Sequence, residues 1–329
     1  MSTAAGHDIP GDQTVADLGE LALIAAVTAR LPAVAPPTLG PGDDAAVLRL
    51  GPSGTVVLTT DVLVEGVDFR RDWSTAQDVG HRAAAANLSD IEAMGAVPTA
   101  LLLALILPAE TKAAWVLELV DGFVSEADAV GAAIIGGDVS AGSQTAVAVT
   151  AVGMAPNGRY LTRSGARPGD AVAVAGRIGW AAAGLTVLSR GFRSPRALVA
   201  AHRRPQPPYG SGARAAAAGA SALIDVSDGL LADLNQVSHA SGVSINIERA
   251  AIPIDEQIRA AAAAFNADPM DWALTGGDDH ALIATFPSDA TLPAEFSVIG
   301  QVLPRASDGP TVLVDGHEWA GSTGFQHFR

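Results

Sequence analysis

Residues 72–108 read DWSTAQDVGHRAAAANLSDIEAMGAVPTALLLALILP, and this stretch decides the class of fold. Its first part predicts a helix, with Ser74 and Gln77 as a capping box and Gly95 as the residue that ends it. The apolar run that follows, PTALLLALILP, predicts a buried strand. A helix leading directly into a buried strand is typical of an α/β protein.

The neighbouring segments continue this alternation. Residues 55–69 are rich in β-branched side chains and predict a long strand or an extended pair, while residues 110–130 predict a second helix. We interpret 132–142, AAIIGGDVSAG, as a short strand that runs into a glycine-rich turn, and 144–155 as another strand.

Turn formers and charged residues concentrate in 155–170, which is the best candidate for a domain boundary. We therefore predict an N-terminal domain of residues 1–160 and a C-terminal domain of residues 161–329. The α/β pattern starts again after the boundary, with strands at 171–176, 221–226, 296–302 and 311–315 and helices at 179–190, 228–241 and 255–265.

Composition excludes several classes of protein. The 329 residues include no cysteine, which rules out disulfides, thiolate metal sites and thiol catalysis. The net charge of −15 argues against nucleic acid as a partner, and Lys112 is the only lysine, so a Walker-type phosphate loop is absent. The longest apolar run, 97–107, is too short to cross a membrane, and we expect a cytoplasmic protein with no membrane partner.

Aspartates beside glycines are the strongest chemical signal. Two similar stretches carry paired aspartates, GPGDDAAVL at 40–48 and TGGDDHALI at 275–283, and this likeness hints at an internal repeat. We expect the further aspartates at the ends of helices and strands, namely Asp61, Asp90, Asp138, Asp225 and Asp228. Two carboxylates a few ångströms apart repel by roughly 4 kcal/mol at an effective dielectric near 20. Oxygen-rich clusters of this kind match Mg²⁺, Mn²⁺ or Ca²⁺, and several carboxylates suggest more than one ion with a polyphosphate between them.

Each of these residues also has an ordinary structural interpretation. A single aspartate beside glycine usually forms a turn or a cap, and Asp225 and Asp228 are as well suited to capping the next helix as to binding metal. Arg163 is more often a solvated loop residue, and we expect His280 and His317 to be ordinary, partly exposed histidines. The number of acidic turns, rather than any one of them, favours a functional site.

Eight motifs taken in order resemble the thiamine-monophosphate kinase family, within the aminoimidazole-ribonucleotide-synthetase-like superfamily. They run from residue 40 to the C-terminus and read GPGDDAAVL, TTDVLVEGVDF, NLSDIEAMGAVPTALLLAL, GGDVSAG, LTRSGARPGD, DVSDGLLADL, LTGGDDHALI and GSTGFQHF. Each motif is weak alone, and their shared order is specific.

The resemblance implies a mixed α/β fold, whose N-terminal domain contributes strands to a barrel across a homodimer and whose C-terminal α/β domain packs against it. It also implies ATP as co-substrate, thiamine monophosphate as acceptor and several Mg²⁺ ions. By match to the family's motifs, the metal ligands would be Asp44, Thr59, Thr60, Asp61, Asp90, Asp138, Asp225 and Asp228. The ATP contacts would be Gly137, Asp138, Arg163 and Ser227.

The chain departs from the family pattern at the expected acceptor end. Asp68 stands where the family often has histidine, and Asp278, His280 and Ala281 replace the usual glutamate, tyrosine and glutamate. Phe325 stands where an aromatic residue usually faces the thiamine moiety. Asp68, Asp278 and Phe325 are therefore the predicted substrate-binding residues.

The resulting hypothesis is transfer of the γ-phosphoryl group of ATP to the phosphate of thiamine monophosphate. A phosphate oxygen is mostly ionised at neutral pH, so no side-chain nucleophile or strong base is required. The alternative within the superfamily is aminoimidazole ribonucleotide synthetase, because the members that use cysteine or selenocysteine chemistry do not fit a chain without cysteine. Two other classes are a magnesium-dependent phosphohydrolase and a non-enzymatic calcium-binding protein.

Overall fold

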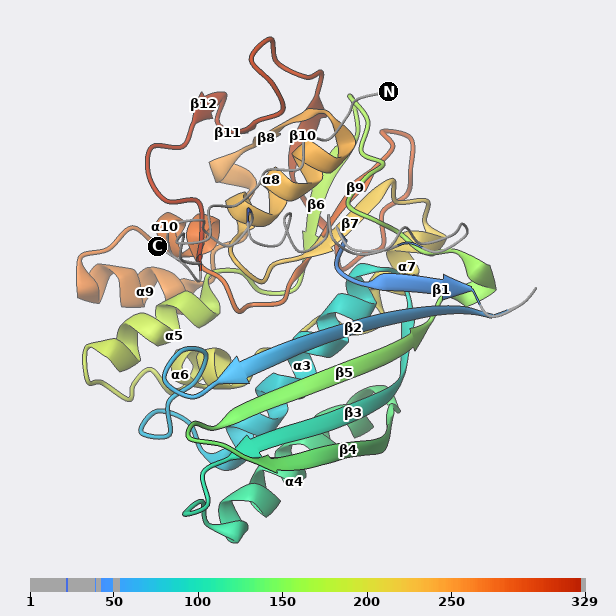
Figure 1. Ribbon diagram of the computed structural model, residues 1–329. Helices are drawn as coiled ribbons and strands as arrows, with labels where there is room; N and C mark the ends of the chain where they lie inside the picture. Colours follow the sequence, from blue (N-terminus) through green and yellow to red (C-terminus); the bar gives the residue numbers. More distant parts are fainter. Residues whose placement is uncertain (1–21, 23–38, 40–42, 50–53, 327–329) are drawn as a thin grey trace, which may run out of the picture.

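The computed structural model describes Ala22, Leu39 and residues 43–49 and 54–326. Two sheets form the centres of two α/β halves that lie one above the other in Figure 1. The two-domain α/β class predicted from the sequence is confirmed. The boundary between residues 160 and 161 stays a prediction.

The first sheet has the strand order β1-β2-β5-β3-β4. Its strands are β1 (Ala46–Arg49), β2 (Thr55–Val64), β3 (Val97–Leu107), β4 (Ala133–Ala141) and β5 (Ala146–Met154), followed by the short 3-10 helix η1 (Pro156–Gly158). Helices α3 (Ala76–Ala93) and α4 (Ala113–Val130) lie together behind this sheet in Figure 1. Fully buried Leu88, Ile91, Leu101, Leu119 and Phe123 fill the space between them.

The start of α3 differs from the prediction by one residue. The N-cap is Thr75 rather than Ser74, and the capping box pairs it with Asp78 rather than Gln77. The Asp78 amide donates to Thr75 Oγ1 over 3.2 Å, and the Thr75 amide donates to Asp78 Oδ2 over 2.9 Å. A carboxylate in the first turn also interacts favourably with the helix dipole, which an amide side chain would not match. Gly95 adopts φ +66° just after the helix, as predicted.

The prediction that residues 132–142 form a short strand running into a glycine-rich turn is wrong in its second part, because β4 continues past both glycines as an edge strand that ends at Ala141. β4 pairs in parallel with β3, and a register shift near Gly136 absorbs the irregularity. A Cβ on Gly137 would lie 1.8 Å from the carbonyl oxygen of Leu103, so these glycines let two strands approach each other rather than reverse the chain.

The second sheet has the order β12-β11-β8-β10-β6-β9-β7. Its strands are β6 (Ala171–Ala175), β7 (Ala222–Asp225), β8 (Ser244–Ile247), β9 (Leu282–Phe286), β10 (Ser297–Leu303), β11 (Val312–Val314) and β12 (His317–Glu318). Its helices are α5 (Trp180–Ser189), α6 (Arg196–Arg203), α7 (Ser211–Ala217), α8 (Leu230–Ser241), α9 (Glu256–Phe265) and α10 (Pro269–Thr275), with the 3-10 helix η2 (Arg249–Ala251). The buried side chains of β6, β7 and β9 form its core.

Helix α3 connects the two halves. It packs on the first sheet, and it also contacts β7, α6 and α7 of the second half. Ser89 on α3 donates a 2.8 Å hydrogen bond to Asp225 at the end of β7. This contact places the C-terminal end of α3 beside the edge of the second sheet. Among the described residues, no helix is long and apolar enough to cross a membrane.

Candidate active site

A cleft of about 900 Å³ opens between the two halves. Side chains from β2, α3, the turn after β7 and the turn before β9 form its walls, and the C-terminal segment 322–326 covers one side. The predicted site residues that line it are Asp44, Thr59, Thr60, Asp61, Asp68, Asp90, Arg163, Ser227, Asp228, Asp278 and Phe325. Residues from distant parts of the chain therefore converge as the sequence motifs indicated.

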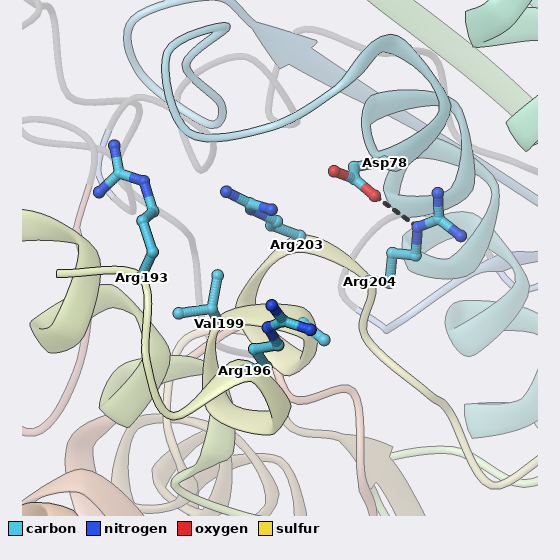
Figure 2. A pocket seen from close by; sticks show the side chains of 7 residues that line it. Asp78, Arg193, Arg196, Val199, Arg203 and Arg204 are labelled. Carbon is cyan, nitrogen blue, oxygen red and sulfur yellow. Dashed lines mark hydrogen bonds and ion pairs between the residues drawn. The ribbon is translucent and has the colours of Figure 1, made fainter.

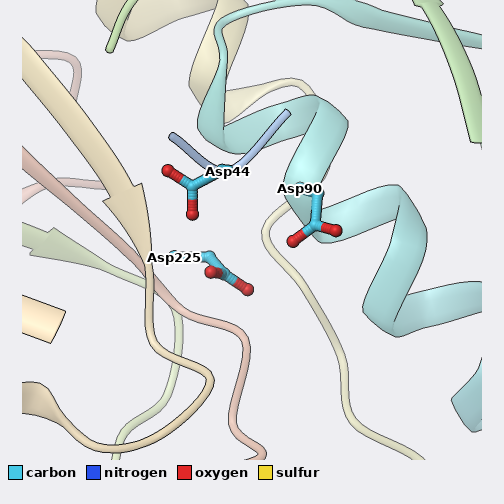
Figure 3. A group of neighbouring side chains, drawn as sticks. All are labelled: Asp44, Asp90 and Asp225. Atoms are coloured by element: carbon cyan, nitrogen blue, oxygen red, sulfur yellow. The ribbon is translucent and has the colours of Figure 1, made fainter. Parts of the chain in front are cut away.

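Three aspartates meet at the inner end of this region (Figure 3). Asp44 precedes β1, Asp90 lies on α3 and Asp225 ends β7. One carboxylate oxygen from each lies within 4.8 Å of the other two. Asp44 and Asp225 are buried. Gly40, Pro41 and Gly42, which precede Asp43 in the sequence motif, lie outside the described residues.

Neighbouring polar groups fix the direction of each carboxylate. Thr59 on β2 donates to Asp90 over 2.7 Å. Arg163 donates to both oxygens of Asp44 over 3.0 Å, and its Nη1 donates to Gln236. Asp225 accepts from Ser89 over 2.8 Å and faces His280 Nδ1 at 2.9 Å. Thr59 on β2, Ser89 on α3, Arg163 and His280 thus hold the three carboxylates in place, and Gln236 on α8 in turn holds Arg163.

Burial and mutual repulsion shift the pKa values of this group. Burial raises the pKa of Asp44 to about 7, although Arg163 opposes the change. Burial, together with the charges of Asp225 and Asp44, raises the pKa of Asp90. Burial opposes ionisation of Asp225 as well, but His280 outweighs it and lowers the pKa of Asp225. Three carboxylates this close, two of them buried, have more negative charge than the guanidinium of Arg163 alone compensates.

These donors suit a hard divalent cation. All are oxygens, no cysteine is present in the chain, and several carboxylates come from separate elements, which matches Mg²⁺ or Mn²⁺ coordination. Two further predicted ligands lie beside the group on β2. Asp61 lines the cleft, and burial raises its pKa, while Thr60 donates to the Val149 carbonyl over 2.8 Å.

Two expectations about the aspartates need correction. Asp61 and Asp138 lie in the middle of strands rather than at their ends. The amides of residues 227–229 at the start of α8 donate to Asp233 Oδ2, each over 3.1 Å, so Asp233 provides this cap. The carboxylate of Asp225 contacts Ser89 and His280 instead.

Gly137 and Asp138 lie apart from the other predicted ligands. Strand register places Val62 on β2, Ala148, Ala104 and Asp138 in one row across the sheet. Three interstrand steps separate Val62 from Asp138, which corresponds to about 14 Å. Every residue of β4 is exposed in the described part of the chain. Asp138 therefore lies apart from the group of Asp44, Asp90 and Asp225 in its own chain.

The cleft also has aromatic and apolar side chains in its walls. They belong to Trp73, Trp272, Leu185 and Phe325. Predicted substrate-binding Asp278 forms a 2.6 Å ion pair with Arg82 on α3, and this charge outweighs burial and lowers the pKa of Asp278. Asp68 Oδ2 accepts from the Val64 amide over 2.7 Å and so fixes the turn after β2.

Several cleft residues were not foreseen. His280 is buried, not partly exposed, and its ring bonds to Asp225. The charge of Asp225 outweighs burial and raises the pKa of His280. Arg82 and His202 also line the cleft. The position of His280 directly after the second aspartate pair could have indicated that it belongs to the cleft. His202 lies on α6, a helix that the sequence pattern did not predict.

Comparisons with known proteins agree with this geometry. Residues 42–155 match the family described as AIR synthase related protein, N-terminal domain, and residues 167–312 match the corresponding C-terminal domain. The thiamine-monophosphate kinase of Mycobacterium tuberculosis is 48% identical over 317 residues, which cover 96% of this chain and 93% of that protein. The Corynebacterium glutamicum thiamine-monophosphate kinase is 41% identical over 322 residues, which cover 96% of this chain and 95% of that protein.

A solved structure is also similar to this chain over nearly its whole length. AaThiL complexed with AMPPCP and TMP superimposes with a TM-score of 0.86 at 31% identity, and the match covers 96% of this chain and 99% of that one.

Proposed function

Since the chain belongs to the thiamine-monophosphate kinase family, we propose that its cleft transfers the γ-phosphoryl group of ATP to the phosphate of thiamine monophosphate. The products are thiamine diphosphate and ADP. The relatives that match nearly the whole chain have this activity in their names, so the alternative of aminoimidazole ribonucleotide synthetase is not favoured. The observation that carries the proposal is the convergence of Asp44, Asp90 and Asp225 at one end of a cleft large enough for two phosphorylated substrates.

Asp44, Asp90 and Asp225 would hold Mg²⁺, with Thr59, Thr60, Asp61 and Asp228 as further ligands from the surrounding walls. Bound Mg²⁺ supplies positive charge that neutralises the phosphates and lets an acidic protein accept an anionic substrate. Thr59, Ser89 and His280 keep the carboxylates in their orientations.

The remaining catalytic task is positioning. The attacking atom is a phosphate oxygen of the acceptor, which is already ionised at neutral pH, so no residue has to remove a proton from it. Arg163 and Ser227 are the proposed ATP contacts in this chain, and both line the cleft. The aromatic side chains that line the cleft, among them Phe325, would pack on the heterocycles of the acceptor.

We further propose that the enzyme is a homodimer in which β4 completes the partner's site. The first sheet leaves Val62, Leu102, Ile106, Ile135 and Val139 between 37% and 68% exposed. Exposed apolar side chains on an edge strand and sheet face are typical of an interface. Gly137 and Asp138, which lie apart from the three aspartates in their own chain, would contact ATP bound to the second copy. The cytoplasm stays the proposed location, because ATP is the co-substrate.

The direct test follows the labelled phosphoryl group. We expect γ-labelled ATP, Mg²⁺ and thiamine monophosphate to give labelled thiamine diphosphate, with no transfer when EDTA replaces Mg²⁺. Labelled inorganic phosphate released at the same rate with and without the acceptor would instead indicate a phosphohydrolase.

A further inference from the structure

A second pocket of about 540 Å³ lies outside the cleft and is strongly basic (Figure 2). It runs along one face of α6, where Arg196, Val199, Ala200 and Arg203 follow one another at helical spacing. Arg193 precedes the helix, Arg204 follows it, and Asp78 comes from the first turn of α3. Of the described residues, none lines both this pocket and the cleft.

The positive charge of this pocket is mostly uncompensated. Among the described residues that line it, Asp78 is the only acid, and its two oxygens already accept from Arg204 and from the Thr75 amide. Arg193 donates to two backbone carbonyls, of Phe192 and Asp72. In the described part of the chain, no carboxylate lies within ion-pair distance of Arg193, Arg196 or Arg203. The carboxylate of Asp72, whose backbone carbonyl accepts from Arg193, is paired with Arg70.

Arg203 points to a missing partner. Its Nε is buried and has no hydrogen-bond partner among the residues that the structure describes. A buried donor without a partner costs about 1–3 kcal/mol, and more when the group is charged, so such groups are usually satisfied by a ligand or an ion. Figure 2 shows the arginine side chains arranged around one common space, with the Asp78–Arg204 pair at its side.

We propose that this pocket binds a diphosphate-type anion independently of the cleft. Several guanidinium groups match phosphate oxygens in geometry and charge, and each is always ionised. A single phosphate would meet fewer of these groups than a diphosphate, and a concave space of this size admits a small ligand rather than a flat macromolecular surface. The local charge is notable because the whole chain carries a net charge of −15.

Titration calorimetry of the full chain with inorganic pyrophosphate tests the proposal, with EDTA present to remove metal-dependent binding in the cleft. The wild-type protein should bind with a dissociation constant of about 1 mM or below. The double variant Arg196→Ala/Arg203→Ala should bind at least about tenfold more weakly, since it removes two charged donors. Alanine favours helices, so α6 should form in this variant, and Arg196→Gln alone provides a milder change if it does not fold.

The matched control is Arg259→Ala/Arg305→Ala, which removes two exposed arginines elsewhere and leaves the net charge the same as in the test variant. This control and Asp90→Asn should bind pyrophosphate like wild type. A parallel titration with ADP identifies the source of the diphosphate, because only a nucleotide site would lose ADP binding in the Arg196→Ala/Arg203→Ala variant. Equal pyrophosphate affinity in this variant and its control, or no binding by wild type near 1 mM, would overturn the proposal.

Discussion

The buried aspartates of the cleft and Asp138 on β4 belong to the same predicted ligand set, yet they occupy opposite environments. Asp44, Asp90 and Asp225 lie within 4.8 Å of one another through single oxygens and are surrounded by fixed donors. Asp138 lies on a fully exposed edge strand, and the donor recorded for its side chain is Ser140, over 2.9 Å. A site made by one chain is buried in that chain, whereas a residue that acts on a second copy has to stay exposed until the copies meet.

This contrast predicts different effects on stability for the two groups. Buried carboxylates that repel one another destabilise the fold in the absence of a cation, while an exposed aspartate contributes little. Both groups should nevertheless be necessary for catalysis. Stability and activity measured on the same variants therefore separate the two environments.

The largest effect is expected for Asp90→Asn. Loss of a metal ligand should lower kcat/KM by about 1,000-fold, within the range known for removing a group that stabilises transition-state charge. The free energy of unfolding without metal should rise by about 1 kcal/mol, because a buried like charge disappears while Thr59 keeps an acceptor. Steady-state kinetics and urea unfolding in EDTA measure the two quantities.

Asp289→Asn, an exposed loop aspartate, is the control and should change neither value. Wild-type activity in Asp90→Asn would remove this residue from the metal site.

A smaller loss of activity is expected for Asp138→Asn. We expect kcat/KM to fall by about 100-fold, since the variant loses one charged contact to ATP or metal. The free energy of unfolding should stay within about 0.5 kcal/mol of wild type, as for other exposed positions. A loss of stability similar to that of a core substitution would contradict the exposed position of Asp138.

His202 lines the cleft, and its burial should make the free energy of unfolding depend on pH. Burial lowers the pKa of His202 from an ordinary 6.5 to about 4. The unfolded chain therefore binds more protons between these values, so stability is full above pH 6.5 and is lost as the pH falls toward 4. Between pH 7 and pH 5 this histidine should account for about 2 kcal/mol of the decrease.

Urea unfolding of His202→Gln at both pH values should show a decrease smaller than that of wild type by this amount. His239→Gln, which changes an exposed histidine on α8, should follow the wild-type decrease. An unchanged decrease in His202→Gln would show that this histidine does not control acid stability.

The smallest effect on activity is expected for a substitution on the exposed face of the first sheet. Ile106→Asp places a charge among exposed apolar side chains on β3 and should weaken self-association, with activity falling about tenfold at low protein concentration. Leu117 is an exposed residue of α4, away from this sheet face, so Leu117→Asp is the control, and this variant should still self-associate. Light scattering measures the mass of both, and an unchanged mass for Ile106→Asp would argue against this face as the interface.

The same contrast explains what could be predicted from the sequence. The order of the aspartate-bearing motifs identifies the cleft residues through their resemblance to a known family, whereas turn preference alone misplaced Asp61 and Asp138, which lie within strands. The part of β4 from Gly136 to Ala141 was missed because pairing with β3, a tertiary contact, overrides the turn preference of its glycines. The buried state of His280 and the pairing of Arg82 with Asp278 depend on segments far apart in the chain, which no local pattern specifies.

The most direct measurement combines the two inactive variants in one dimer. Asp90→Asn and Asp138→Asn, coexpressed with different tags and purified as the mixed species, should contain one site with both changes and one site with neither. If each site takes Asp90 from one copy and Asp138 from the other, this mixed dimer recovers about half of wild-type activity, because half of its sites are intact. Activity no higher than that of the separate variants would contradict a site shared between two copies.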